Sequence, residues 1–210
     1  MKPKVVETEV AIPAIETQRV TITLIGISPL VMNRFSPTAI KAIRDKQTGE
    51  ATNKRGKKKP DQLYEESIYR KEDGSLTFPA SALKAVALGG VRHVEGLTII
   101  ASPGLFFIDE DSIVVEGKPE KFEAVVRNET GVCDLRYRAK FHEWSLTFSV
   151  DFDPNAITLA QLLHLYVQGG HRVGIGDGRP ASKKNHNFAF GRFKVAGAEE
   201  FKEKKLKAAE

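Results

Sequence analysis

The feature that most limits the fold is a run of nine residues in which apolar and polar side chains alternate strictly. From Trp144 to Phe152 every second residue is aromatic or aliphatic, and serine, threonine or aspartate stands between them. A period of two residues is typical of a β-strand that buries one face. The same alternation between Arg19 and Ile25 predicts a first core strand. We therefore expect a sheet with one buried face.

A short helix is predicted soon after this first strand. Ser36 is a favourable N-cap residue, Pro37 suits the first helical position, and Gly49 is a typical stop, so the helix is expected over 38–47. The basic segment that follows, 48–61, has too few apolar residues to bury itself. We expect a mobile loop there.

Two stronger apolar patterns predict the core helices. The first runs through Ala82–Val86 and is expected to end at Gly89–Gly90. The second begins at Thr158–Gln161, which fits a capping box, and is expected to end at Gly169–Gly170. Shorter apolar runs predict further strands over 97–100, 105–108, 112–115, 122–127 and 190–195.

Without insertions, the order of these elements is strand, helix, strand, strand, helix, strand. This order predicts an α+β fold with a ferredoxin-like (RRM-like) βαββαβ core and extra β-hairpins. We expect one RRM-like domain over 18–196, with tails over 1–17 and 197–210. We expect a basic insertion over 41–72 between the first strand and the first core helix. Because this fold hosts many functions, it does not identify one.

Composition narrows the class of protein. Cys133 is the only cysteine among the 210 residues, which excludes an internal disulfide framework and a multi-cysteine zinc site. No stretch of about 18 apolar residues occurs, so no membrane segment is expected. We expect a soluble protein in a reducing compartment, the cytoplasm.

Positive charge is concentrated in two segments, although the formal net charge is only +5. Residues 41–59 hold eight basic and two acidic side chains, and residues 171–194 hold six basic side chains and one aspartate, Asp177. Such segments suit an anionic partner such as nucleic acid. An ordinary solvated surface explains each of them equally well.

The second basic segment begins with the glycine-rich sequence 173–180. Glycines permit close backbone approach and positive φ, so Gly174 and Gly176 could let N–H groups converge on a phosphate. The order of elements excludes a dinucleotide fingerprint and a P-loop, because here the glycines follow a helix and lead into a strand. A flexible connector is the alternative reading.

Two motifs carry a resemblance to a known family. The sequence from Phe78 to Ala85, ending at Val91-Arg92, resembles the helix start of the repeat-associated RAMP superfamily. The loop from Gly174 to Phe193 is similar to the glycine-rich loop before that superfamily's last strand. Ala82 and Ala85 stand where many members carry serine or glycine. The chain is also similar to small phage and prophage proteins.

The resemblance implies an antiviral, CRISPR-type role, because RAMP proteins include guide-RNA backbone subunits and endoribonucleases. It implies that the insertion over 41–72 is a thumb-like element. It also implies contacts to a nucleic-acid backbone at this insertion, the first core helix and the glycine-rich loop. A basic strand that begins at Asp134 adds Arg136, Arg138 and Lys140 on one side and Tyr137 on the other. Besides Lys140, the expected binding residues are Lys54, Arg55, Lys57, Lys58, Lys84, Arg92, Arg136, Arg138, Arg172, Gly174, Gly176, Arg179, Lys183, Lys184 and Arg192.

Signals for catalysis are sparse. The five histidines lack the spacing of a zinc peptidase, and neither a metal nor a cofactor is expected. His171 borders the glycine-rich loop and is the candidate general acid or base for RNA cleavage. Asp45 and Asp61 are the candidates for the cleaving aspartate that some RAMP backbone subunits carry.

The favoured hypothesis is a non-enzymatic protein that binds single-stranded RNA, or DNA, along its backbone. Such a protein would form a homo-oligomeric filament or join a larger CRISPR-type ribonucleoprotein. One alternative is a metal-independent endoribonuclease that uses His171. Another is a phage protein, either a single-stranded-DNA-binding recombination protein or a structural one.

Overall fold

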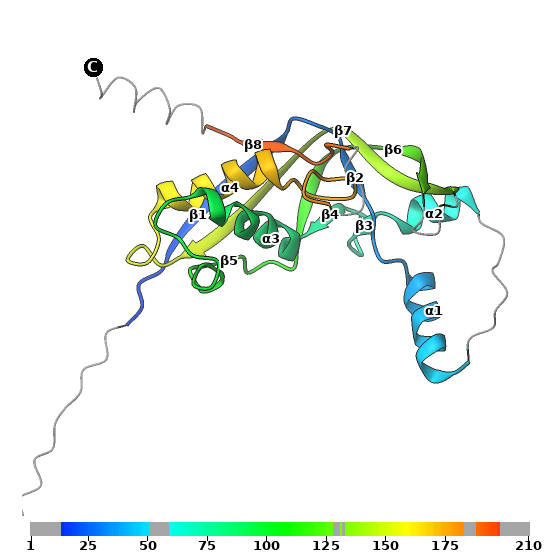
Figure 1. Ribbon diagram of the computed structural model, residues 1–210, viewed down its shortest axis with the longest axis horizontal. Coiled ribbons are helices and arrows are strands. Elements are labelled where there is room, and N and C mark those ends of the chain that lie inside the picture. Colours follow the sequence, from blue (N-terminus) through cyan, green and yellow to red (C-terminus); the bar gives the residue numbers. More distant parts are fainter. Residues whose placement is uncertain (1–13, 51–58, 128–130, 132, 183–187, 198–210) are drawn as a thin grey trace, which may run out of the picture.

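The computed structural model describes residues 14–50, 59–127, 131, 133–182 and 188–197. Within these residues the fold is α+β, and all strand pairs are antiparallel. The main sheet has the order β3-β4-β6-β7-β1-β8, and β2 and β5 also pair with β7. Figure 1 shows the sheet with helices on one of its faces. The strands are β1 Gln18–Gly26, β2 Leu30–Met32, β3 Tyr69–Arg70, β4 Leu76–Pro79, β5 Phe106–Phe107, β6 Ser112–Arg127, β7 Cys133–Phe152 and β8 Phe193–Val195.

Two helices, α3 Ala80–Gly90 and α4 Leu159–Arg172, pack against each other over the sheet (Figure 1). The predicted capping box is present, with Thr158 and Gln161 each bonding the other's backbone. The sequence suggested that α4 ends at Gly169 and Gly170, but both glycines are buried inside the helix. A Cβ at Gly169 would clash with the carbonyl of Val86, so glycine here permits the close approach of the two helices.

The core lies between these helices and the sheet. Ile22 and Leu24 of β1 are fully buried, as are Leu146, Phe148 and Val150 of β7. These residues belong to the two alternating runs. The alternation therefore predicted both the strands and the face that each one buries.

The β6–β7 hairpin is larger than the sequence suggested. The predicted strands over 112–115 and 122–127 are parts of one strand, β6, and β7 begins eleven residues before Trp144. A register shift between Gly117 and Pro119 separates the two halves of β6. The strand predicted over 97–100 is wrong, because these residues lie outside the strands in turns and irregular backbone.

The predicted helix after the first strand is α1, Pro37–Thr48. The Ser36 side chain accepts from the Ala39 N–H, and Gly49 ends the helix at φ 79°. No residue of α1 is buried, and Figure 1 shows the helix projecting from the sheet. A further helix, α2 Pro60–Glu66, lies at the end of the segment that was expected to be a loop.

Candidate nucleic-acid interface

The glycine-rich loop after α4 packs tightly against the protein's own backbone. Gly176 has φ 80°, and a Cβ there would lie 2.5 Å from the carbonyl oxygen of Val31 in β2. Gly191 has φ 66°, and a Cβ there would overlap the carbonyl of Ile175. Only glycine satisfies both the positive φ and the close contact. Gly176 therefore fixes the loop on β2, and Gly191 fixes the two ends of the loop against each other.

Three N–H groups of this loop are used within the protein. Gly174 donates to Gly169, Ile175 donates to Gly191 at 3.0 Å, and Asp177 donates to Val31 at 2.8 Å. A backbone cradle of the kind suggested by the sequence would need these groups to point at a phosphate. Side chains of the loop, rather than these three amides, are therefore left to meet an anion.

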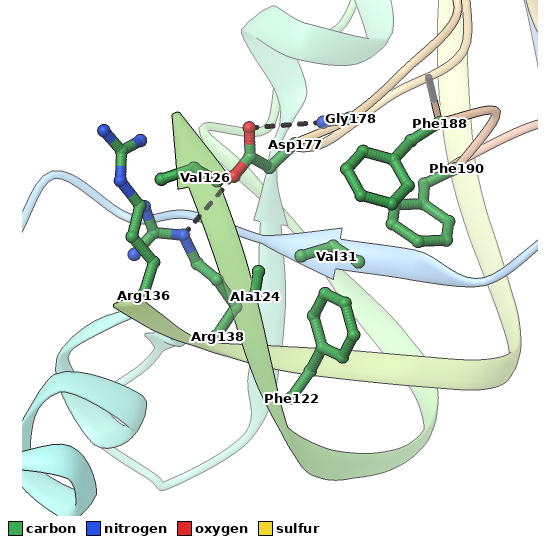
Figure 2. Close-up of a pocket in the computed structure, with 10 residues that line it drawn as sticks. All are labelled: Val31, Phe122, Ala124, Val126, Arg136, Arg138, Asp177, Gly178, Phe188 and Phe190. Carbon is green, nitrogen blue, oxygen red and sulfur yellow. Dashed lines mark hydrogen bonds and ion pairs between the residues drawn. The ribbon is translucent and has the colours of Figure 1, made fainter. Parts of the chain in front are cut away.

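Three phenylalanine rings gather where the loop meets the hairpin (Figure 2). Phe188 and Phe190 stack with ring centroids 4.9 Å apart and an interplanar angle of 14°. Phe122 of β6 meets Phe190 edge to face at 6.0 Å. All three side chains are partly exposed. Sequence reasoning did not select them, although the Phe188-x-Phe190 spacing beside the basic loop was visible.

Three basic side chains of β7 lie beside these rings. Lys140 stands over Phe122 and Phe190, with Nζ at 4.9 and 5.4 Å from the ring centroids. A small hollow lies beside the rings, and Arg136 and Arg138 both line it, as the alternation along the strand predicted (Figure 2). Cations next to aromatic faces are favourable for a ligand that combines phosphate with flat rings.

Asp177 of the loop holds Arg138 in place. The Arg138 Nε lies 3.4 Å from Oδ2 of Asp177, whose Oδ1 accepts from the Gly178 N–H at 3.2 Å. Burial lowers the pKa of the Arg138 guanidinium, and the negative charge of Asp177 opposes that shift. An arginine nevertheless stays charged at neutral pH. The ion pair therefore orients a permanent cation at the edge of the hollow.

The hollow between hairpin and loop is shallow. Its volume is about 20 Å³, which holds roughly one water molecule. A nucleobase therefore cannot enter it. The arrangement suits a chain that lies across the surface, with rings stacked on exposed phenylalanine faces.

The other described basic residues that were expected in or beside the loop do not line this hollow. Arg192 contacts the His171 Nδ1 at 3.0 Å, so the candidate acid or base meets a guanidinium. Arg179 donates to the carbonyl of Gly176 at 3.2 Å and is exposed. Arg172 donates to Gln168 at 2.9 Å in the last turn of α4.

The remaining expected residues are not part of this hollow. Lys84 stands over Phe107 at 4.6 Å, and Arg92 is exposed in the turn Val91–His93. Asp45 is on α1, and Asp61 pairs with Lys121 at 2.6 Å. Lys54, Arg55, Lys57, Lys58, Lys183 and Lys184 lie outside the described residues.

The open face of the sheet has a different chemistry. Thr23 contacts Thr147 at 3.0 Å across β1 and β7, and the hydroxyls of Thr21 and Ser149 are 3.5 Å apart. At the end of this row Arg19 forms ion pairs with the carboxylates of Asp109 and Asp151. The rings of Phe148 and Phe152 in this part of β7 point to the core, and an exposed ring beside this row is Phe107 of β5, which pairs in register with Asp151.

Comparison with known proteins assigns no family. No protein-family model and no curated protein matches the chain. Among solved structures, Cmr6 from Pyrococcus furiosus aligns with 86% of this chain and 99% of its own, at 10% identity and a TM-score of 0.39. These values are too low to assign a fold family or a function.

Within the described ranges, none of the helices has the length and apolar character of a membrane span. The same residues contain no group of three or more histidine, cysteine or acidic side chains that could hold a metal ion.

Proposed function

We propose that this chain binds single-stranded nucleic acid, RNA in the first instance, along the surface formed by β7 and the glycine-rich loop. The observation that carries the proposal is the row of Arg136, Arg138 and Lys140 beside the partly exposed rings of Phe122, Phe188 and Phe190. Basic side chains neutralise phosphates, and aromatic faces stack on bases of any sequence. Binding of this kind is salt-sensitive and largely independent of sequence.

The strand order supports a ferredoxin-like core and, with it, the RAMP resemblance. Strands β8, β1, β7 and β6 are neighbours in this order, and all three pairs are antiparallel. Helix α3 lies in the chain between β1 and β6, and α4 lies between β7 and β8. A split βαβ fold has this order of elements, so the order supports that assignment. We propose the domain at 18–196, with the thumb-like insertion at 41–72.

We further propose that the protein works as one of several subunits along a strand, as a filament or in a CRISPR-type ribonucleoprotein. The proposed surface contacts the phosphate backbone and exposed ring faces, which repeat along any strand. Copies or partner subunits can therefore bind side by side on one nucleic acid.

Fluorescence anisotropy of labelled single-stranded RNA and DNA, repeated from low to high salt, tests the proposal. Each phosphate contact to a single strand adds about 0.7 to the slope of log K against log salt. The double variant Arg136→Gln with Lys140→Gln should therefore lower that slope by about 1.4 and weaken binding at low salt.

The matched control removes one arginine and one lysine from the open sheet face, with Arg19→Gln and Lys194→Gln. This variant should keep the wild-type slope. Absence of binding by the wild type at low salt would refute the proposal. Cleavage of the RNA in EDTA that is lost in His171→Ala would instead favour the endoribonuclease alternative.

A further inference from the structure

A second hollow lies on the other side of the glycine-rich loop. Its volume is about 230 Å³, and its walls come from α3 and from the loop. Val86 and Ile175 form a buried apolar floor, whereas Ala85 and Arg179 are exposed at the opening. A cavity of about 150 Å³ accommodates benzene, so this hollow has room for a larger flat ring.

Small side chains create the space. Ala82 and Ala85 stand one turn apart on α3, opposite Gly174 and Gly176 of the loop. The lining contains no acidic residue, and Arg179 is its single charged group. The bond from Arg179 to the Gly176 carbonyl holds the guanidinium at the rim. An apolar recess with one cation at its mouth suits a ring that is linked to a phosphate.

The loop connects this hollow to the proposed strand-binding surface. Asp177 and Gly178 line the shallow aromatic hollow, and the residues on either side, Gly176 and Arg179, line the apolar one. A strand that crosses the loop therefore passes from the phenylalanine rings to Arg179 and then to the recess. No other charged group in the lining competes for that phosphate.

We propose that the apolar hollow between α3 and the glycine-rich loop receives one nucleobase of the bound strand, while Arg179 contacts the adjoining phosphate. This inference rests on the proposed function. Because the lining offers no side-chain hydrogen-bonding group other than Arg179, the site accepts a base by shape and burial. It therefore tolerates different bases and anchors the strand at one nucleotide per subunit.

The test uses Ala85→Leu in the full chain, with single-stranded RNAs that each carry one 2-aminopurine at a different position. Leucine keeps the helix propensity of α3 and fills the recess from its exposed edge. The matched control is Ser81→Leu, an exposed position on the same helix that does not line the hollow.

With the wild type and Ser81→Leu, one 2-aminopurine position should become brighter on binding and protected from acrylamide, because its base leaves its neighbours and enters an apolar site. With Ala85→Leu this signal should disappear and the affinity should fall roughly tenfold, the scale expected for one base contact.

The outcomes separate the two proposals. If the wild type binds no strand, the proposed function fails and this inference fails with it. If the wild type binds and Ala85→Leu leaves the signal and the affinity unchanged, the base site is refuted while strand binding stands. A change of oligomeric state in Ala85→Leu, with the 2-aminopurine signal kept, would show that the hollow seats another copy of the chain and would also refute the base site.

Discussion

The open face of the sheet and the surface between β7 and the glycine-rich loop both hold basic side chains, but in opposite settings. On the open face, Arg19 bonds Asp151 through Nε at 2.6 Å and Asp109 through Nη2 at 2.6 Å. At the loop, the ion pairs of the two β7 arginines are longer. Arg138 is 3.4 Å from Asp177 and Arg136 is 3.9 Å from Asp134.

The uncharged side chains of the two surfaces also differ. Hydroxyls on the open face meet one another across β1 and β7, as the contact between Thr23 and Thr147 shows. At the loop, the rings of Phe188 and Phe190 stack on each other and stay partly exposed. Surface charge alone therefore does not distinguish the two surfaces. What distinguishes the loop is that two arginines and one lysine of a single strand lie beside three partly exposed rings.

The largest effect is expected from Gly191→Ala, which would displace the glycine-rich loop. The methyl group would overlap the Ile175 carbonyl at a positive φ, so we expect a loss of more than about 3 kcal/mol in the free energy of unfolding. Denaturant unfolding measures it, and strand binding should fall with the displaced loop.

Gly49→Ala is the matched control for that change. Gly49 has φ 79° at the end of α1, but nothing lies within 4 Å of the added Cβ. The left-handed conformation alone costs roughly 1–2 kcal/mol. Equal losses in the two variants would mean that close packing of the loop is not what Gly191 provides.

An intermediate effect is expected from Phe188→Ala, which tests the contribution of the aromatic rings at the loop. Removing one stacking ring should weaken binding to single strands by about 1–3 kcal/mol, with the salt slope unchanged because no charge is lost. Anisotropy titrations measure both quantities. Phe107→Ala, which removes a more exposed ring (52%) on β5 away from the loop, should bind as the wild type does. Similar weakening in both variants would contradict a specific stacking site.

The smallest effect concerns the ion pair on the open face. Its hydrogen bond to Arg19 lowers the pKa of Asp151 below the usual value for aspartate. A carboxyl with a lowered pKa stabilises the folded state above its unfolded pKa of about 3.9, and that contribution is lost as the pH falls through the folded value. Stability should therefore decrease on acidification, and less steeply in Asp151→Asn.

Denaturant midpoints of the wild type and Asp151→Asn between about pH 6 and pH 2 measure this difference. The effect should be small and should shrink in high salt, because Arg19 is exposed and water screens the pair. Affinity for single strands at neutral pH should not change. A change in affinity would place part of the binding surface on the open face.

Most of the secondary structure could be predicted because its signals are local. The alternation through Trp144–Phe152, the cap at Ser36 and the capping box at Thr158 each depend on residues within one turn or strand. The errors came where packing decides. Gly169 stays helical because α3 and α4 approach there, and residues 97–100 have strand-like composition without a strand partner.

The candidate site was predictable only in part. The face shared by Arg136 and Arg138 follows from alternation along one strand. Their aromatic neighbours do not, because Phe122 faces Arg138 only through the register of the β6–β7 hairpin. Phe188 reaches the same place through the folded loop, which is far from both in the sequence.

The sequence by itself determined the α+β composition, the helix caps and which face of β1 and β7 is buried, because periodicity and capping act over a few residues. The tertiary structure decided which cations meet aromatic rings and which meet carboxylates. That choice depends on the register of the β6–β7 hairpin and on the bond from Asp177 to Val31, which joins residues more than a hundred positions apart.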